Sequence, residues 1–128
     1  MKKNILIADK DEAFLKELSE MLTMNNFNSK TFIKLDEAFA YAKKNKSDII
    51  IFDIGINGKD YYRNFEIVKS LIDNGIKIIA TISYCDETNF VILKINSGIK
   101  TFFIKPVIPL DIIEKINKII NTGDNHEK

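Results

Sequence analysis

Four polar residues stand where chemistry is expected, because each one ends a short apolar run. They are two carboxylates, Asp9 and Asp53, one hydroxyl, Ser83, and one ammonium group, Lys105. Carboxylates suit a hard divalent cation, which prefers oxygen ligands. A hydroxyl and an ammonium group suit a phosphoryl group, and an aspartate can act as a nucleophile that forms an aspartyl phosphate. If these four side chains meet, they predict a site for phosphoryl chemistry.

The hydrophobic pattern predicts the elements that must position these residues. Short apolar runs alternate with stretches in which apolar residues recur at helical spacing. The expected strands cover 4–8, 29–33, 48–53, 76–82 and 101–104; the expected helices begin at Asp11, cover 35–44, 65–72 and 86–96, and begin again at Pro109. Asp11 is a good N-cap residue. Five repeats of strand and helix predict a parallel sheet with helices on both faces.

The run 48–53 is the most informative of the expected strands. Its four consecutive bulky residues show no alternation, which is typical of a strand covered on both faces. For a chain of 128 residues with five strands, we expect a doubly wound α/β fold with strand order 2-1-3-4-5. The ligand site of such a fold lies beyond the carboxyl ends of the strands, between the first and the third. Asp9 and Asp53 should therefore meet there.

The spacing of these residues resembles the receiver domain of two-component response regulators. Asp53 and Ser83 are 30 positions apart, Ser83 and Lys105 are 22 apart, and Lys105-Pro106 resembles the Lys-Pro motif of that family. The resemblance covers residue 1 to about residue 120. It implies a cytoplasmic signalling domain that is not an enzyme. We expect the receiver domain to cover 1–121 and the segment 122–128 to be a polar tail or the start of a linker.

The resemblance also implies a role for each candidate residue. Asp53 is the expected phosphoacceptor, and Lys105 is expected to contact the phosphoryl oxygens. Ser83 takes the position of the switching hydroxyl, and Phe102 that of the switch aromatic. Asp9, Asp53 and the backbone carbonyl of Gly55 are the expected ligands of Mg²⁺.

Three features of the sequence depart from the family pattern. The second acid after the first strand, normally a metal ligand, is replaced by Lys10, whose ammonium group has no acceptor for Mg²⁺. Asn57 takes the place of a proline and Asp60-Tyr61 that of Asp-Gly, while Tyr84 replaces a small residue. We therefore expect Mg²⁺ binding to be weak or absent. Lys10 has two possible positions: extended into solvent, or between Asp9 and Asp53 in place of the cation.

The composition restricts the classes of partner. The formal net charge is +1, and no apolar run is long enough to span a membrane, so we expect neither direct nucleic-acid binding nor a membrane anchor. One cysteine and one histidine exclude a disulfide framework and a zinc cluster. The acidic segment after the first strand disfavours a flavodoxin-like redox protein, which needs a phosphate-binding loop there.

Two functions remain at the level of the sequence. The first is a response regulator receiver domain that takes a phosphoryl group from a histidine kinase and signals to an unknown output protein or domain. The alternative is a degenerate receiver that acts through protein contacts without phosphorylation. The expected output face combines helix 86–96, strand 101–104 and the last helix. Ile112 and Ile119 are expected to form an exposed apolar patch there, for a partner or a homodimer.

Overall fold

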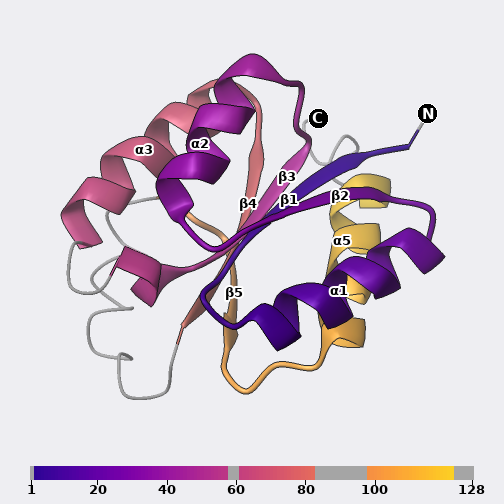
Figure 1. The fold of residues 1–128 in the computed structure, drawn as a ribbon. Helices are drawn as coiled ribbons and strands as arrows, with labels where there is room; N and C mark the ends of the chain where they lie inside the picture. The colour runs from indigo at the N-terminus through magenta and orange to yellow at the C-terminus, as the bar shows by residue number, and fades with distance from the viewer. Residues whose placement is uncertain (1, 58–60, 83–97, 123–128) are drawn as a thin grey trace.

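The computed structural model describes residues 2–57, 61–82 and 98–122 (Figure 1). Five parallel strands form one sheet in the order β2-β1-β3-β4-β5, which confirms the expected topology. The elements are β1 (Asn4–Ala8), α1 (Glu12–Met24), β2 (Asn28–Phe32), α2 (Leu35–Lys44), β3 (Ile49–Asp53), a 3₁₀ turn (Ile54–Asn57), α3 (Tyr61–Asp73), β4 (Lys77–Ile82), β5 (Thr101–Ile104) and α5 (Pro109–Thr122). The expected helix 86–96 and the end of the expected tail, 123–128, lie outside the described residues.

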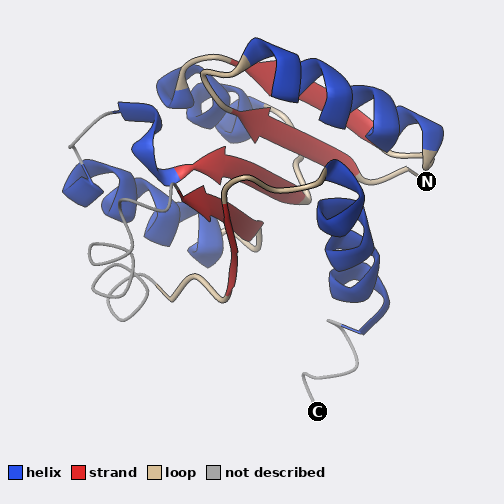
Figure 2. Ribbon diagram, turned by 90° about the horizontal axis from the view of Figure 1, so that it is seen from below, coloured by secondary structure: helices blue, strands red, loops and turns tan. Residues whose placement is uncertain are grey.

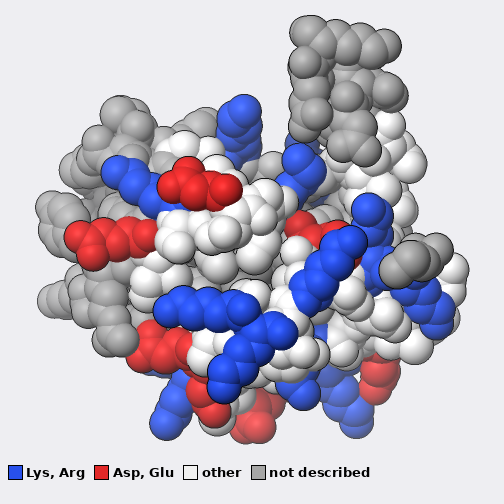
Figure 3. All heavy atoms as spheres, turned by 90° about the horizontal axis from the view of Figure 1, so that it is seen from above, with Lys and Arg blue, Asp and Glu red and all other residues white. Residues whose placement is uncertain are grey.

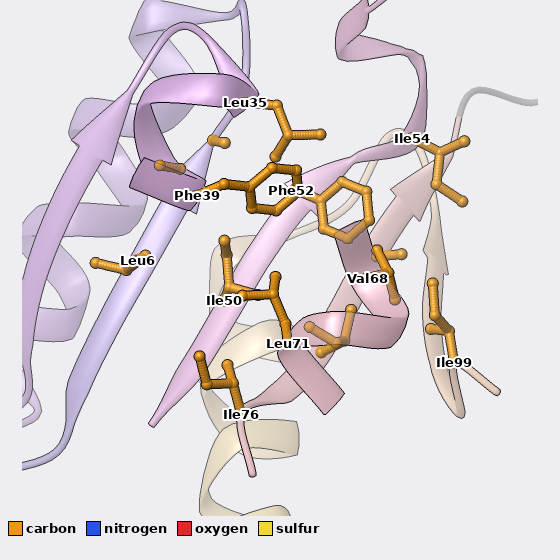
Figure 4. Close-up of a cluster of buried hydrophobic side chains, with 14 of the residues drawn as sticks. Leu6, Leu35, Phe39, Ile50, Phe52, Ile54, Val68, Leu71, Ile76 and Ile99 are labelled. Atoms are coloured by element: carbon orange, nitrogen blue, oxygen red, sulfur yellow. The ribbon is translucent and has the colours of Figure 1, made fainter. Parts of the chain in front are cut away.

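Helices cover the two faces of the sheet, with α1 and α5 on one side and α2 and α3 on the other (Figures 1 and 2). Strand β3 shows why the fold is doubly wound. Ile49 and Ile51 belong to the buried layer beneath α1 and α5, whereas Ile50 and Phe52 belong to the layer beneath α2 and α3. Figure 4 shows Ile50 and Phe52 among their neighbours in the second layer. All four side chains are buried, so the unbroken apolar run is explained.

Local signals in the sequence set the ends of α1. The Asp11 side chain accepts a hydrogen bond from the Phe14 backbone N–H at 3.1 Å, which confirms Asp11 as the N-cap. The helix is followed by Asn26, whose φ of 69° lies in the left-handed region that asparagine tolerates better than most residues. These two signals fix where the chain turns between β1 and β2.

The expected apolar patch on α5 was partly wrong. Ile112 is fully buried with Ile113 and Ile116, and Ile119 is partly buried against the same layer. The expectation assumed that the helix packs only on the sheet, but α5 also contacts α1. A helix that packs on two neighbours buries a wider arc of its surface than one that packs on the sheet alone. Leu110, at the start of α5, is instead 49% exposed.

Charged side chains are distributed unevenly between the two edges of the sheet. Exposed lysines stand at the first residue of a strand or up to three residues before it in four cases: Lys3, Lys46, Lys77 and Lys100. Figure 3, a view from above, shows basic side chains spread over this surface with several acidic ones among them. At the carboxyl edge the helices begin with acids, Glu12 in α1 and Asp36 and Glu37 in α2. Acids at helix starts are favoured by the helix dipole, so the carboxyl edge is the acidic one.

Among the described residues, no helix has the length and apolar content that crossing a membrane requires.

Candidate functional site

The two candidate carboxylates lie side by side at the carboxyl edge of the sheet. Strands β1 and β3 pair up to Ala8 and Phe52, and Asp9 and Asp53 are the next residue of each chain segment. The Asp9 backbone N–H donates to the Phe32 carbonyl at 3.0 Å, which ties this position to β2 as well. Asp9 is buried, and the Asp53 side chain is 14% exposed. This edge of the sheet is the switch point predicted from the strand order.

An ammonium group lies between the two carboxylates, and it belongs to Lys105. Its Nζ is 2.9 Å from Asp9 Oδ2 and 3.5 Å from Asp53 Oδ2. The Lys105 backbone N–H donates to the Ile82 carbonyl at 2.8 Å, which extends the pairing of β5 with β4 and aims the chain toward the site. The peptide bond between Lys105 and Pro106 is cis. Sequence reasoning brought Lys105 to this edge but did not predict its contact with Asp9.

Lys10 is exposed, so of its two possible positions the structure has the one in solvent. Within the described part of the chain it forms no ion pair with Asp9 or Asp53. Lys105 occupies the position between the carboxylates that the second possibility gave to Lys10.

The two carboxylates are held with different tightness. Asp9 Oδ1 accepts the Asp11 backbone N–H at 2.9 Å, and its Oδ2 takes the short contact with Lys105. Asp53 Oδ1 accepts the Gly55 backbone N–H at 3.4 Å, and its Oδ2 lies at the longer distance from Lys105. The Asp9 side chain is therefore held by two short contacts, whereas the contacts of the Asp53 side chain are longer and weaker.

Burial and charge set the protonation of the site. Burial raises the pKa of Asp53 above its ordinary value of 3.8, and the negative charge of Asp9 adds to the effect; Lys105 and the Gly55 amide oppose it. Burial alone would lower the pKa of Lys105, but its hydrogen bond to Asp9 and the nearby charge of Asp53 outweigh burial, so that pKa is raised. The ammonium group thus stays charged, and the Asp53 oxygen atoms are more basic than those of an exposed aspartate.

We expect Asp53→Asn to raise the melting temperature at pH 7 by roughly 3–6 °C, about 1 kcal/mol for a domain of this size. Because the pKa of Asp53 is raised on folding, the folded protein binds a proton there more tightly than the unfolded chain. The ionised carboxylate therefore costs stability as the pH rises through the folded pKa, and this cost disappears below the unfolded value of 3.8. Thermal unfolding of both proteins across this pH range measures the difference.

Asp73→Asn is the control for that measurement, because Asp73 is an exposed carboxylate at the end of α3. A stability gain of Asp53→Asn that grew on acidification, or that Asp73→Asn reproduced, would contradict the assignment to burial of Asp53.

The residues present fit a divalent cation only in part. Asp9 and Asp53 offer oxygen ligands, and a Cβ added at Gly55 would lie 3.8 Å from Asp53 Oδ2, so the glycine leaves room beside that carboxylate. However, the described residues contain no group of three or more His, Cys, Asp or Glu side chains that would hold a metal ion. With Lys10 in the position of the missing acid, the oxygen set is smaller than Mg²⁺ prefers.

The remaining candidate residues divide between described and undescribed positions. Ser83, Tyr84 and Asp60 lie outside the described residues. Phe102 packs against the layer beneath α2 and α3, on the opposite face from its neighbour Phe103. Sequence reasoning missed Thr81, a buried hydroxyl on β4. Its signal was available, because Thr81 is the one polar residue in the apolar run 78–82.

Comparisons with known proteins agree with this arrangement. Residues 5–117 match the family described as response regulator receiver domain. The chain is 34% identical over 124 residues to the chemotaxis protein CheY of Thermotoga maritima, which covers 93% of this chain and 98% of that protein. It is 22% identical to the DNA-binding response regulator MtrA of Mycolicibacterium paratuberculosis, covering 98% of this chain and 54% of the relative. The chain therefore spans about half the length of that relative.

Solved structures share the fold. A CheY-like receiver domain protein from Methanospirillum hungatei superposes with a TM-score of 0.82 at 24% identity, covering 98% of this chain and 99% of that one. A response regulator from Burkholderia pseudomallei, solved with a phosphorylated aspartic acid, a calcium ion and citrate, has a TM-score of 0.72 at 20% identity. The match covers 98% of this chain and 73% of that one.

Proposed function

Because this chain belongs to the response regulator receiver domain family, we propose that Asp53 accepts a phosphoryl group from a histidine kinase. A receiver domain is a signalling module rather than an enzyme, and it implies a histidine kinase as its partner. The proposed place of action is the cytoplasm. The observation that carries the proposal is the position of the Lys105 ammonium group, 3.5 Å from the mostly buried Asp53 carboxylate at the switch point of the sheet.

The geometry supports a direct transfer. An Asp53 oxygen attacks the phosphorus atom of the donor, a new O–P bond forms, and the P–N bond to the donor histidine breaks. The raised pKa of Asp53 makes this oxygen a better nucleophile than that of an exposed aspartate. The Lys105 ammonium group is close enough to stabilise the negative charge that develops on the phosphoryl oxygens. Asp9 holds this ammonium group at the site through a contact of 2.9 Å.

A divalent cation, when bound, supplies positive charge that neutralises the phosphoryl oxygens. Asp9, Asp53 and the Gly55 carbonyl are the groups that would hold it. Our proposal is a weak Mg²⁺ site, since the position beside Asp9 carries Lys10.

We assign the conformational relay to Ser83 and Phe102, and the output contact to the face that includes β5 and α5. Three large apolar side chains are exposed around the junction of these elements, with exposed fractions of 45% for Ile104, 63% for Ile108 and 49% for Leu110. They replace Ile112 as candidates for contact with an output protein or with a second copy of the chain. Such side chains are favoured at interfaces between proteins.

Incubation with acetyl phosphate followed by intact-mass measurement tests the phosphoacceptor. We expect one phosphoryl adduct on the wild-type chain and none on Asp53→Asn, because an amide cannot form the acyl phosphate. Asp73→Asn, a change of equal charge on exposed α3 surface, should keep the adduct. An adduct that persists in Asp53→Asn would assign the phosphate to another residue.

The second candidate function is a degenerate receiver that works through protein contacts alone. It is favoured by the contact of Lys105 with both carboxylates, since the site is already neutralised in part without phosphate or metal. In that case the wild-type chain takes up no phosphoryl group from acetyl phosphate or from a kinase. The same mass measurement therefore separates the two functions.

A further inference from the structure

A buried hydroxyl on β4 has no evident structural role. Thr81 is 1% exposed, and its Oγ1 has no hydrogen-bond partner among the residues that the structure describes. A buried hydroxyl without a partner has lost its hydrogen bonds to water and gained nothing in return. Valine has nearly the same shape and would avoid this cost, so the hydroxyl at this position needs an explanation.

The position of Thr81 links it to the phosphoacceptor. In the sheet, Thr81 pairs with Asp53 on one side and with Phe103 on the other. Two residues earlier, Ile51 on β3 and Ile79 on β4 both belong to the layer beneath α1 and α5. Side chains alternate along a strand, so Asp53 and Thr81 project from that same face of the sheet on neighbouring strands.

The Lys105 side chain passes over the same strand. Lys105 follows β5, yet its Nζ reaches Asp53 at the end of β3 and Asp9 after β1. In the strand order, β4 lies between β5 and β3, so the lysine side chain must cross β4 to make these contacts. Thr81 therefore lies on the strand that the Lys105 side chain crosses to reach the Asp53 carboxylate.

The hydrogen bonding of Asp53 leaves a place for a further donor. Its two contacts with described residues, the Gly55 amide at 3.4 Å and Lys105 at 3.5 Å, are both longer than a good hydrogen bond. Asp9, in comparison, has two contacts of 2.9 Å. Among the described residues, an incompletely satisfied acceptor and a donor without a partner thus occupy paired positions on adjacent strands.

We propose that Thr81 is a positioning residue for Asp53, whose hydroxyl donates a hydrogen bond to the Asp53 side chain once that side chain carries a phosphoryl group. This inference rests on the proposed function of Asp53. When the Lys105 ammonium group turns toward the phosphoryl oxygens, the Asp53 oxygen that it contacted loses that partner. The Thr81 hydroxyl, which has no partner among the described residues, is a donor on the neighbouring strand, and its hydrogen bond fixes the orientation of the acyl phosphate.

Beryllofluoride, which adds to a carboxylate oxygen in the shape of a phosphoryl group, is the probe that tests this role. Its affinity is measured by titration of the melting temperature, with excess magnesium chloride throughout, for the wild type, Thr81→Val and Thr81→Ser. We expect the valine variant to melt at or above the wild-type temperature without ligand, because it removes an unpartnered hydroxyl. It should bind beryllofluoride about tenfold more weakly, the effect of one lost hydrogen bond to a charged group. The serine variant keeps the hydroxyl and should bind as the wild type does.

Each other outcome has a defined meaning. Wild-type affinity in the valine variant would overturn the role of Thr81 while leaving that of Asp53 intact. Equal weakening in the valine and serine variants would assign the effect to packing of the methyl group and also overturn the role. A valine variant that melts well below the wild type would show that the hydroxyl already has a partner at rest, and this too would overturn the role. If the wild type itself binds no beryllofluoride and takes no phosphoryl group, the proposed function fails and this inference with it. If Thr81→Val does not fold, Thr81→Ala takes its place in the same beryllofluoride titration.

Discussion

Replacing Lys105 with methionine should lower the free energy of unfolding at pH 7 by about 2–4 kcal/mol, because it leaves the buried Asp9 and the mostly buried Asp53 without their counter-charge. Methionine retains most of the apolar length of the lysine side chain, so the change isolates the ammonium group. Asp9 is 2% exposed and loses its 2.9 Å contact, while Asp53 loses the only described cation beside it. Urea unfolding measures the difference, and acidification, which protonates carboxylates, should recover part of it.

Lys100→Met is the matched control, since Lys100 is an exposed lysine just before the same strand. It should change the free energy of unfolding by less than about 0.5 kcal/mol. Equal stability of the two variants would mean that the contacts of Lys105 with Asp9 and Asp53 contribute nothing to folding.

Lys10→Asp should tighten Mg²⁺ binding at least tenfold. The substitution exchanges an ammonium group for a carboxylate directly beside Asp9, which removes a repelling charge and adds an oxygen ligand. Isothermal titration calorimetry with magnesium chloride measures the affinity of both proteins. The expected result for the wild type is weak binding.

Lys34→Asp separates this local effect from a general change in charge. Lys34 is exposed and precedes α2, so the variant alters the carboxyl edge of the sheet equally without adding a ligand beside Asp9. If it tightened Mg²⁺ binding as much as Lys10→Asp, or if Lys10→Asp had no effect, the weakness of the site would have another cause than Lys10.

The topology was predictable because it follows from patterns that are local in the sequence. The uninterrupted apolar run that ends at Asp53 predicted a central strand covered on both faces, and Asp11 predicted the start of α1; both are confirmed. The alternation of strands and helices then leaves few possible orders, because crossovers are right-handed and short. The same reasoning brought Asp9 and Asp53 together at one edge.

The arrangement within the site depends on contacts that the sequence does not express. Lys105 and Asp9 are 96 positions apart, and a lysine side chain with four rotatable bonds reaches several neighbours from one strand end. Its final partner is decided by the competing charges around it. For the same reason two positions of Lys10 remained open until the structure showed it exposed.

The error at Ile112 has a different origin. A helical projection describes one helix against one plane, and Ile112 falls outside the arc that a sheet alone would cover. Its burial depends on α1, which is brought beside α5 by the strand order and not by any feature of the α5 sequence. Replacing Ile112 with lysine would therefore place a charge in the hydrophobic core and would not test a surface contact.

The unequal charges of the two sheet edges influence how other molecules approach this domain. The edge that carries Asp53 also carries the acids at the starts of α1 and α2, while exposed lysines line the opposite edge. A small anionic phosphodonor that diffuses toward the protein is attracted to the lysine edge, whereas at the edge of Asp53 the acids at the helix starts oppose the attraction of Lys105. A protein donor with basic residues around its phosphohistidine is steered in the opposite sense, toward Asp53. If Asp53 accepts a phosphoryl group as we propose, we expect this charge distribution to favour a protein donor over free anions, and the preference to fade as salt screens the charges.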